Sequence, residues 1–359
     1  MITLVTRRAS WKLVTSVAAV VLLGLSASRA GAQAEWETLN AGTSASLRGL
    51  HAVSDRVVWA SGTAGTVIHT VDGGASWRLD SIPMASPFDI RAVHARSEMV
   101  AHAAATAGRI WRTLDGGKSW SLRYQATDTT VFLDAIAFWD NRHGIALGDP
   151  IGGRFFVLLT DDGGETWREA PVESRPAAVD GEAAFAASGT SLVAMGIGAA
   201  WIASGGRVAR VHRTVDRGRT WQVSDTPIQG GSGSNGVFSI SFATLRDGVA
   251  VGGDYRFPDS TRATAAFTRD GGVTWEPARV LPRGYRSGVS TRWRRGTRVL
   301  ALAVGTNGSD YSLDGGVSWT ALDATGFNAV AVSPSGVAFA VGDRGRLARM
   351  DTGRLTGSH

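Results

Sequence analysis

One eight-residue pattern recurs six times and constrains the fold more than any other feature of the sequence. It reads Ser or Thr, any residue, Asp, usually Gly-Gly, any residue, Ser or Thr, and Trp, and it begins at residues 70, 113, 160, 214, 268 and 312. Its aspartates lie 43, 47, 54, 54 and 44 residues apart, and a degenerate copy, RMDTG at 349–353, follows the last one. A period of this length predicts an array of similar supersecondary units.

The segments between the copies indicate what each unit contains. In LRGLHAVSDRVVWASGTAGTVIHTVDGG (47–74), three short runs of alternating or apolar residues are separated by turn residues, and a fourth run begins at the tryptophan of the octapeptide. Glycine is abundant, with 46 residues, and no segment after the first 34 residues has a useful helical period. Four short strands per unit of 40 to 55 residues predict an all-β chain folded as a β-propeller of four-stranded antiparallel blades.

The ends of the predicted propeller complement each other. The last unit lacks a fourth strand, while EWETL (35–39) resembles the run after an octapeptide, with Trp36 in place of the tryptophan. An N-terminal strand that completes the last blade would close the ring and remove two exposed sheet edges. We therefore expect seven blades over 35–352 and a short tail at 353–359, or six blades if the last unit is irregular.

The octapeptide itself is predicted to be a hairpin turn between the third and fourth strands of a blade. Its glycines permit positive φ, its aspartate accepts backbone N–H groups, and its tryptophan packs against a sheet. The alternative, a calcium-binding loop, would require several carboxylates per turn, and most copies have one. The structural aspartates and tryptophans are Asp72, Trp77, Asp115, Trp120, Asp162, Trp167, Asp216, Trp221, Asp270, Trp275, Asp314 and Trp319.

These octapeptides resemble the Asp-box, or bacterial neuraminidase (BNR) repeat, (S/T)-x-D-x-G-x-(S/T)-W. That repeat occurs in sialidases, other glycosidases, sorting receptors and the photosystem II stability/assembly factors. The regular spacing, the length and the closing strand resemble the last group, as do the segments AFWDNRHGIALGDP (137–150) and GEAAFAASGTSLV (181–193). The resemblance implies a protein-binding scaffold that assists a membrane-protein complex.

The first 32 residues are predicted to be a cleavable export signal. Arg7, Arg8 and Lys12 precede the apolar run 13–25, which is short for a membrane span, and small residues follow it. TRRASWK (6–12) partly resembles a twin-arginine export motif. We expect an exported, periplasmic protein that associates peripherally with the membrane and has no transmembrane span after cleavage.

Composition excludes several functions. The chain has no cysteine, which excludes disulfides, thiolate metal sites, iron–sulfur clusters and cysteine nucleophiles. The net charge of +6 falls to +2 without the four basic residues of 1–32, so nucleic acid is not an expected partner. GIGAAW (196–201) has only the first two glycines of a dinucleotide-binding loop and no βαβ context. No cofactor or metal is expected, although His51 and His94 occupy equivalent strand positions.

Aligning the units predicts a binding site where the first strands begin and the second strands end, at one mouth of the central channel. Three arginines there could hold a carboxylate or phosphate, with acids to orient it; the alternative is that these groups only solvate the mouth. The candidate residues are Arg48, Arg91, Asp134, Asp149, Glu182, Asp254, Arg286 and Asn328, together with Phe238, Thr63, Thr106, Thr306 and Asp343 in equivalent positions.

A second candidate surface is a basic patch at the hairpin between the first two strands of the sixth blade. Its residues are Arg292, Arg294, Arg295 and Arg298. A solvated turn is one interpretation, and a contact with an acidic partner or an anionic lipid is the other.

The sequence thus supports two function classes. The first is a non-enzymatic propeller, monomeric by itself, that acts as an assembly factor or accessory subunit of a membrane-protein complex, such as a photosynthetic reaction centre. The second is a glycan-binding or sialidase-like propeller, for which Tyr255 or Tyr285 could join the mouth residues; its (F/Y)-R-I-P motif has only YRFP (255–258) as a counterpart, in the fifth blade.

Overall fold

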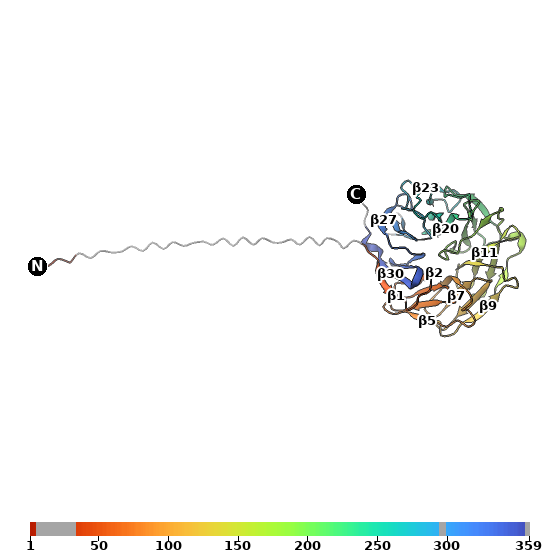
Figure 1. Ribbon diagram of the computed structural model, residues 1–359, viewed down its shortest axis with the longest axis horizontal. Helices are drawn as coiled ribbons and strands as arrows, with labels where there is room; N and C mark the ends of the chain where they lie inside the picture. The colour runs from red at the N-terminus through yellow and green to blue at the C-terminus, as the bar shows by residue number, and fades with distance from the viewer. Residues whose placement is uncertain (5–33, 294–298, 356–359) are drawn as a thin grey trace. The chain divides into compact units, whose positions relative to one another are not determined.

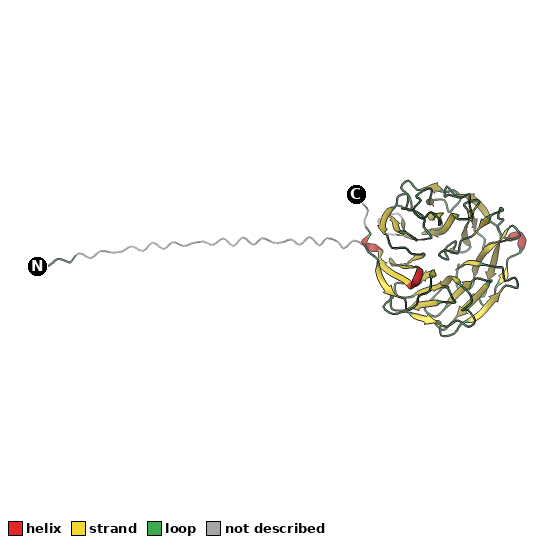
Figure 2. Ribbon diagram, in the orientation of Figure 1, coloured by secondary structure: helices red, strands yellow, loops and turns green. Residues whose placement is uncertain are grey.

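Seven antiparallel sheets follow one another around a ring, and each sheet is one blade of a β-propeller (Figure 1). The computed structural model describes residues 1–4, 34–293 and 299–355, so the predicted signal peptide lies almost entirely outside the described residues. Strands and the turns between them make up nearly all of the ring, with three single-turn 3₁₀ segments (Figure 2). Within the described ranges, no helix is long and apolar enough to span a bilayer. The predicted seven-bladed all-β fold is confirmed.

The first three blades follow the chain in order, each sheet running from the channel outward. Blade one consists of β2 (Leu47–Ala52), β3 (Val58–Gly62), β4 (Val67–Thr70) and β5 (Arg78–Asp80). Blade two consists of β6 (Ile90–Ala95), β7 (Ala101–Ala105), β8 (Arg109–Thr113) and β9 (Ser121–Gln125). Blade three consists of β10 (Leu133–Phe138), β11 (Gly144–Ile151), β12 (Arg154–Thr160) and β13 (Arg168–Glu169), followed by η1 (Val172–Ser174).

Blades four to six keep this order with one addition, because two short strands extend the sheet of blade five. Blade four consists of β15 (Leu192–Met195), β16 (Ala199–Ala203), β18 (Arg210–Thr214) and β19 (Gln222–Asp225). Blade five consists of β20 (Asn235–Phe242), β21 (Gly248–Asp254), β22 (Ala265–Thr268) and β23 (Glu276–Pro277), extended by β14 (Glu182–Ala183) and β17 (Gly205–Gly206). Blade six consists of β24 (Gly288–Trp293), β25 (Val299–Gly305), β26 (Gly308–Ser312) and β27 (Thr320–Asp323).

Blade seven joins the two ends of the chain, as the sequence predicts. It consists of β28 (Ala329–Val332), β29 (Val337–Val341), β30 (Arg346–Asp351) and the N-terminal β1 (Glu37–Asn40), with η2 (Asp343–Gly345) and η3 (Thr352–Arg354) beside β30. β1 pairs with β30 in antiparallel register, and Glu37 forms an ion pair with Arg349, 2.8 Å between Oε2 and Nε. The ring is closed by hydrogen bonds within this sheet.

The core consists of seven apolar clusters, and each lies between two successive blades. The tryptophan of each octapeptide packs into the cluster between its own blade and the preceding blade; Trp120, for example, is 6% exposed in the cluster of blades one and two. Trp36 occupies the matching place between blades six and seven and donates its indole N–H to the Ser309 hydroxyl at 3.0 Å. The N-terminal strand therefore supplies the seventh tryptophan.

The octapeptide forms the turn between the third and fourth strands. In the copy of blade two, the Thr113 hydroxyl donates to Asp115 Oδ1 at 2.9 Å and accepts the Gly117 N–H at 2.9 Å. Asp115 also accepts the backbone N–H and the hydroxyl of Ser119, at 2.9 and 2.6 Å. These hydrogen bonds, first the one from the Ser119 hydroxyl, lower the pKa of Asp115 to about 2. The carboxylate is thus used within its own turn.

Candidate functional site

A β-bulge recurs near the start of the first strand and directs one residue per blade out of the ladder. The register shifts between Leu47 and Gly49 in β2, and in the same way in β6, β10 and β20. The residues passed over are Arg48, Arg91, Asp134 and Phe238. A bulge leaves its extra residue unpaired and redirects its side chain, so four predicted mouth residues share one structural cause.

These side chains meet in a cavity of about 460 Å³ at the mouth of the channel. We call it the mouth cavity. The predicted residues that line it are Arg48, Arg91, Asp134, Asp149, Phe238, Thr306, Asn328 and Asp343. The lining residues not among the predicted mouth positions are Phe132, Ala184, Phe185, Ala186, Ala187, Tyr255, Tyr285 and Ser287. Asn328 is held in place because its amide donates to Leu47 O and Asp343 Oδ1, both at 3.0 Å.

The two arginines of the mouth cavity differ in their partners. Arg91 Nη2 lies 2.8 Å from Asp89 Oδ2, and burial lowers the Arg91 pKa. Within the described part of the chain, the side chain of the half-buried Arg48 makes no hydrogen bond or ion pair. A guanidinium offers five N–H donors in a planar fork that matches a carboxylate. Arg48 is therefore available to a carboxylate on a ligand.

Two carboxyl groups, those of Asp134 and Asp149, line the same cavity. Asp134 is 1% exposed and its Oδ2 has no hydrogen-bond partner among the described residues. Burial and then the charge of Asp149 raise the pKa of Asp134 well above its usual range, against the opposing effect of Arg91. Burial also raises the pKa of Asp149, which accepts the Ala184 N–H at 3.2 Å. A negative charge on Asp149 therefore disfavours ionisation of Asp134.

Aromatic rings form another wall of the mouth cavity. Phe185 stacks on Phe238, with ring centroids 3.8 Å apart and planes 7° apart. Tyr285 meets Phe238 edge to face at 4.8 Å, while Tyr255 is 47% exposed at the rim. Phe185 comes from the segment after β14, which has no counterpart in the other blades. Repeat alignment could not find it for that reason.

Glu182 does not belong to the mouth, contrary to the prediction. It lies on β14, which pairs with β17, whereas the first strand of blade four is β15. Glu182 is 5% exposed and accepts hydrogen bonds from His212, Arg210 and Ser204, which outweigh the effect of burial and lower its pKa to about 2. The insertion before β15 shifted the alignment of blade four.

Arg286 is also not at the mouth, because the alignment of blade six was wrong by one residue. Gly288 pairs with Val304 as Gly49 pairs with Ser61, so Ser287 is the counterpart of Arg48. A shift of one residue moves a side chain to the other face of a strand. Arg286 is fully buried, and its Nε donates to Asp310 Oδ2 at 2.6 Å. The mouth cavity therefore has two arginines, Arg48 and Arg91, and not the three that were predicted.

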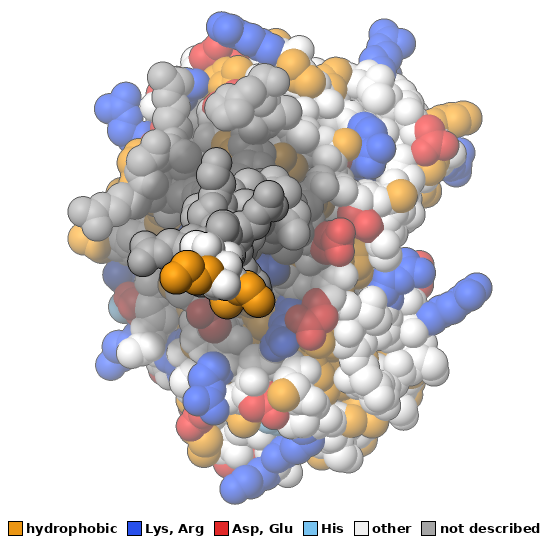
Figure 3. Space-filling model, turned by 90° about the vertical axis from the view of Figure 1, so that its left-hand side faces the viewer, with side chains coloured by type: hydrophobic (Ala, Val, Ile, Leu, Met, Phe, Trp, Pro, Cys, Tyr) orange, Lys and Arg blue, Asp and Glu red, His pale blue; other side chains and the backbone are white. Residues whose placement is uncertain are grey.

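The remaining predicted residues are outside the mouth cavity. Asp254 is 8% exposed and accepts the Arg256 N–H at 2.9 Å. In the basic patch, Arg292 is half-buried on β24, and Arg294, Arg295 and Arg298 lie outside the described residues. On the side of the molecule seen in Figure 3, basic and acidic side chains are interspersed.

A second cavity of about 250 Å³ lies farther along the first strands. We call it the histidine cavity. Two residues after each mouth position, a buried aliphatic side chain lines it: Leu50, Val93, Ile136, Ile240, Val289 and Val330. His51 and His94 also line it, with rings 4.4 Å apart, and burial lowers the pKa of His51 to about 4. Within the described ranges, no three His, Cys, Asp or Glu side chains are grouped as metal ligands.

Comparison with known proteins identifies the fold but not a family. No family model and no curated protein matches the sequence. Among solved structures, YCF48 bound to a D1 peptide is 16% identical, with a TM-score of 0.61 over 88% of this chain and 96% of the other. YCF48 from Cyanidioschyzon merolae is 17% identical, with a TM-score of 0.59 over 89% and 99%. An ancestral GH74 enzyme is 14% identical, with a TM-score of 0.62 over 87% of this chain and 45% of the other.

Proposed function

We propose that this chain is an exported, non-enzymatic propeller whose mouth cavity holds a segment of a protein partner. In this proposal it acts on the periplasmic side of the membrane as an assembly factor or accessory subunit of a membrane-protein complex. In a phototrophic source, that complex would be a photosynthetic reaction centre. The observation that carries the proposal is Arg48, a half-buried guanidinium with no hydrogen bond or ion pair among the described residues, in a preformed cavity of about 460 Å³.

The contents of the mouth cavity suit a peptide. Arg48 and Arg91 can bind a side-chain or terminal carboxylate bidentately. The wall of Phe185, Phe238 and Tyr285 offers apolar surface next to them. Burying an aromatic or aliphatic side chain against that wall would contribute apolar area, and the arginines would determine orientation.

The fold comparison supports a protein partner. The assembly factor YCF48, in the structure with a D1 peptide, has a similar fold over nearly its whole length. The octapeptides are of a kind that also occurs in glycosidases, and it is their regular spacing and the closing N-terminal strand that resemble the photosystem II stability/assembly factors.

Affinity purification from solubilised native membranes tests the proposal. We expect the tagged wild-type protein to recover one membrane complex in near-stoichiometric amount, and the Arg48→Gln, Arg91→Gln variant to recover at least tenfold less. Arg246→Ala is the matched control, because its guanidinium binds only the Arg269 carbonyl among described residues, at the octapeptide end of the strands. Equal recovery by the double variant, or no complex with wild type, would refute the proposal.

A glycan is the second candidate ligand, because Asp134 and Asp149 are coupled carboxyl groups with raised pKa beside two arginines and two tyrosines. A protonated carboxyl group beside an ionised one is the arrangement of a glycosidase acid and its partner. Hydrolysis of a sialoside reporter that is lost in Asp134→Asn would favour this candidate. No hydrolysis above the rate of that variant would exclude it.

A further inference from the structure

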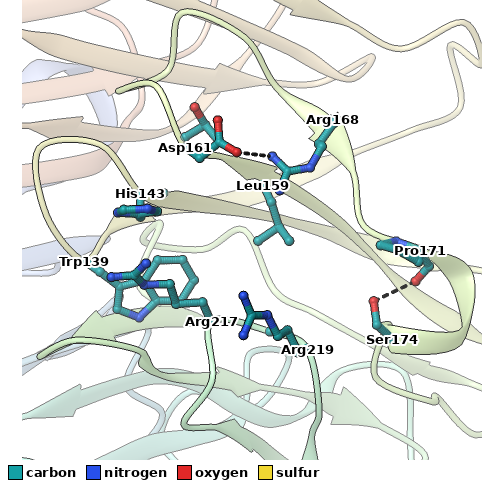
Figure 4. Close-up of a pocket in the computed structure, with 12 residues that line it drawn as sticks. Trp139, His143, Leu159, Asp161, Arg168, Pro171, Ser174, Arg217 and Arg219 are labelled. Atoms are coloured by element: carbon teal, nitrogen blue, oxygen red, sulfur yellow. Dashed lines mark hydrogen bonds and ion pairs between the residues drawn. The ribbon is translucent and has the colours of Figure 1, made fainter.

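A third cavity, of about 390 Å³, lies between blades three and four at the end of the strands opposite the mouth. The mouth lies where the second strands end. Because neighbouring strands are antiparallel, the octapeptide turn, which follows the third strand, lies at the opposite end of the blade. Six of its lining residues are Trp139, His143, Arg168, Pro171, Arg217 and Arg219 (Figure 4). None of the described residues lines both this cavity and the mouth cavity. We call it the inter-blade pocket.

The octapeptide of blade four departs from the other five copies at this pocket. The residue after the aspartate is glycine in the others, with φ between 70° and 80°, and it is Arg217 here, with φ of 61°. An L-residue in this conformation is strained. The turn itself forms without an arginine in five blades, so the arginine is not needed to make the turn.

Part of Arg217 has a structural explanation. Its Nε donates to the Ile197 carbonyl at 2.8 Å, which ties the octapeptide to the β15–β16 hairpin. In blades one, three and five, a hairpin arginine makes the reverse connection to the octapeptide; Arg142, for example, donates to the Asp161 carbonyl. Arg217 Nη2 lies 3.5 Å from Asp140 Oδ2, which leaves other donors of this guanidinium facing the pocket.

Arg219 has no such explanation. Its counterparts in the other copies are Ala75, Lys118, Glu165, Val273 and Val317, so the turn does not require a cation there. In the described part of the chain, the side chain of Arg219 makes no hydrogen bond or ion pair, and it approaches the pocket from the same turn as Arg217 (Figure 4). Arg168 Nη1 lies 3.1 Å from Asp161 Oδ2, and His143 Nδ1 lies 2.8 Å from Asp140 Oδ2. Arg219 is therefore the arginine of the pocket whose guanidinium has no ion pair among the described residues.

The remaining wall is apolar and fixed. Trp139 is half-buried, and its indole N–H donates to the Ala199 carbonyl at 2.6 Å, which holds the ring in one orientation. Leu159 and Pro171 line the pocket with it. Aromatic and aliphatic faces beside a few directed polar groups are typical of small-molecule sites, and the volume is in the range of such sites.

We propose that the inter-blade pocket binds an anionic sugar unit. Arg219 and the free donors of Arg217 hold its carboxylate or sulfate group, and the apolar wall at Trp139 packs against the sugar ring. A planar guanidinium pair selects an oxyanion, and the size of the pocket selects a ring-sized body over a bare ion. This site is separate from the mouth cavity, so it stands or falls independently of the proposed function.

Isothermal titration calorimetry of the chain without residues 1–32 tests the site. The probes are an oligogalacturonate, a chondroitin sulfate disaccharide, a neutral galactose oligosaccharide and inorganic sulfate. We expect wild type to bind at least one of the two anionic sugars, with no binding of the neutral sugar and at least tenfold weaker binding of inorganic sulfate. Arg219→Ala should weaken sugar binding at least tenfold.

Lys118→Ala is the matched control, because it removes one positive charge from the same octapeptide position of blade two. It should bind as wild type does. Arg217→Gly restores the sequence of the other copies, so it should fold, as checked by circular dichroism, and should bind more weakly. No anionic sugar bound by wild type, equal binding of the neutral sugar, inorganic sulfate bound as tightly as the sugars, or unchanged binding by Arg219→Ala would each overturn the proposal.

Discussion

The first side chain of the octapeptide, a serine or threonine, is more buried than the aspartate two residues later. Thr268 is 3% exposed, donates to Asp270 Oδ1 at 2.8 Å and accepts the Gly272 N–H at 2.9 Å. The hydroxyl therefore satisfies a backbone donor inside the turn and orients the carboxylate outside it. Serine or threonine at this position and the aspartate two residues later form one hydrogen-bonded unit.

Replacing Thr268 with valine tests this role with little change in shape. Thr268→Val leaves the Gly272 N–H buried without an acceptor, which costs about 1–3 kcal/mol. We expect the free energy of unfolding, measured in urea, to fall by that amount. The exposed Thr325, whose side chain makes no hydrogen bond to the described residues, serves as the control, and Thr325→Val should change the free energy of unfolding by less than about 0.5 kcal/mol. Equal effects of the two substitutions would contradict the account.

We expect Arg286 to contribute to stability and Arg48 to contribute to binding alone. Arg286→Met leaves the buried Asp310 without its partner, a change that costs about 3–5 kcal/mol. Arg48→Met removes a side chain that makes no hydrogen bond or ion pair with the described residues, and should change the free energy of unfolding by less than about 0.5 kcal/mol. Chemical denaturation of the two variants checks the contrast. A stable Arg286→Met protein would show that the buried pair is dispensable.

At the scale of strands, three histidines on β2, β6 and β7 are neighbours; His102 is fully buried, and His51 and His94 are half-buried. His51 and His94 stand at equivalent positions, and His102 pairs with His94 across the β6–β7 ladder. Burial, the first cause in each case, lowers the pKa of His51 to about 4 and that of His102 to about 3, and lowers the pKa of His94 well below 6.5. All three are neutral in the fold at neutral pH.

This placement predicts acid sensitivity. Because each pKa is lower in the folded than in the unfolded chain, the unfolded chain binds protons first as the pH falls below 6.5, and stability is lost from there toward pH 4. The double variant His51→Ala, His94→Ala tests this prediction. Alanine is compatible with the position, because blade three has Ala137 there. Between pH 7 and pH 5, we expect this variant to lose less free energy of unfolding than wild type, by on the order of 2 kcal/mol.

The measurement is the pH dependence of chemical denaturation, compared between wild type and the double variant. Asp134 and Asp149 have a raised pKa, so their protonation makes the fold more stable as the pH falls, opposite to the effect of the histidines. Both proteins contain them, so their contribution cancels in the comparison. Parallel pH profiles would contradict the account, whatever the absolute stabilities.

At the scale of the whole molecule, the period and the turn residues were sufficient to predict the ring. The octapeptides marked the end of each third strand, and Trp36 marked the closing strand, because the same packing between blades recurs seven times. The hydrogen bonds of the turns and the burial of the tryptophans recur with the sequence repeat, so they can be predicted from the repeat.

The site was only partly predictable because it lies where the repeat breaks. Arg48, Arg91 and Asp134 obey the repeat and were found. Glu182 was misplaced by an insertion, Arg286 by a shift of one residue, and Phe185 belongs to a segment without counterparts. Which carboxyl groups have a raised pKa and which side chains lack a hydrogen bond depends on packing across blades, which no single unit determines.

The most direct test of the mouth cavity as a partner site is site-specific photo-crosslinking in native membranes. A photoreactive phenylalanine analogue would replace Tyr255, 47% exposed at the mouth cavity, or Leu114, 54% exposed on the octapeptide turn of blade two. We predict one discrete cross-linked membrane protein from position 255 and none from position 114. A cross-link from 114 alone, or from neither position, would contradict the account.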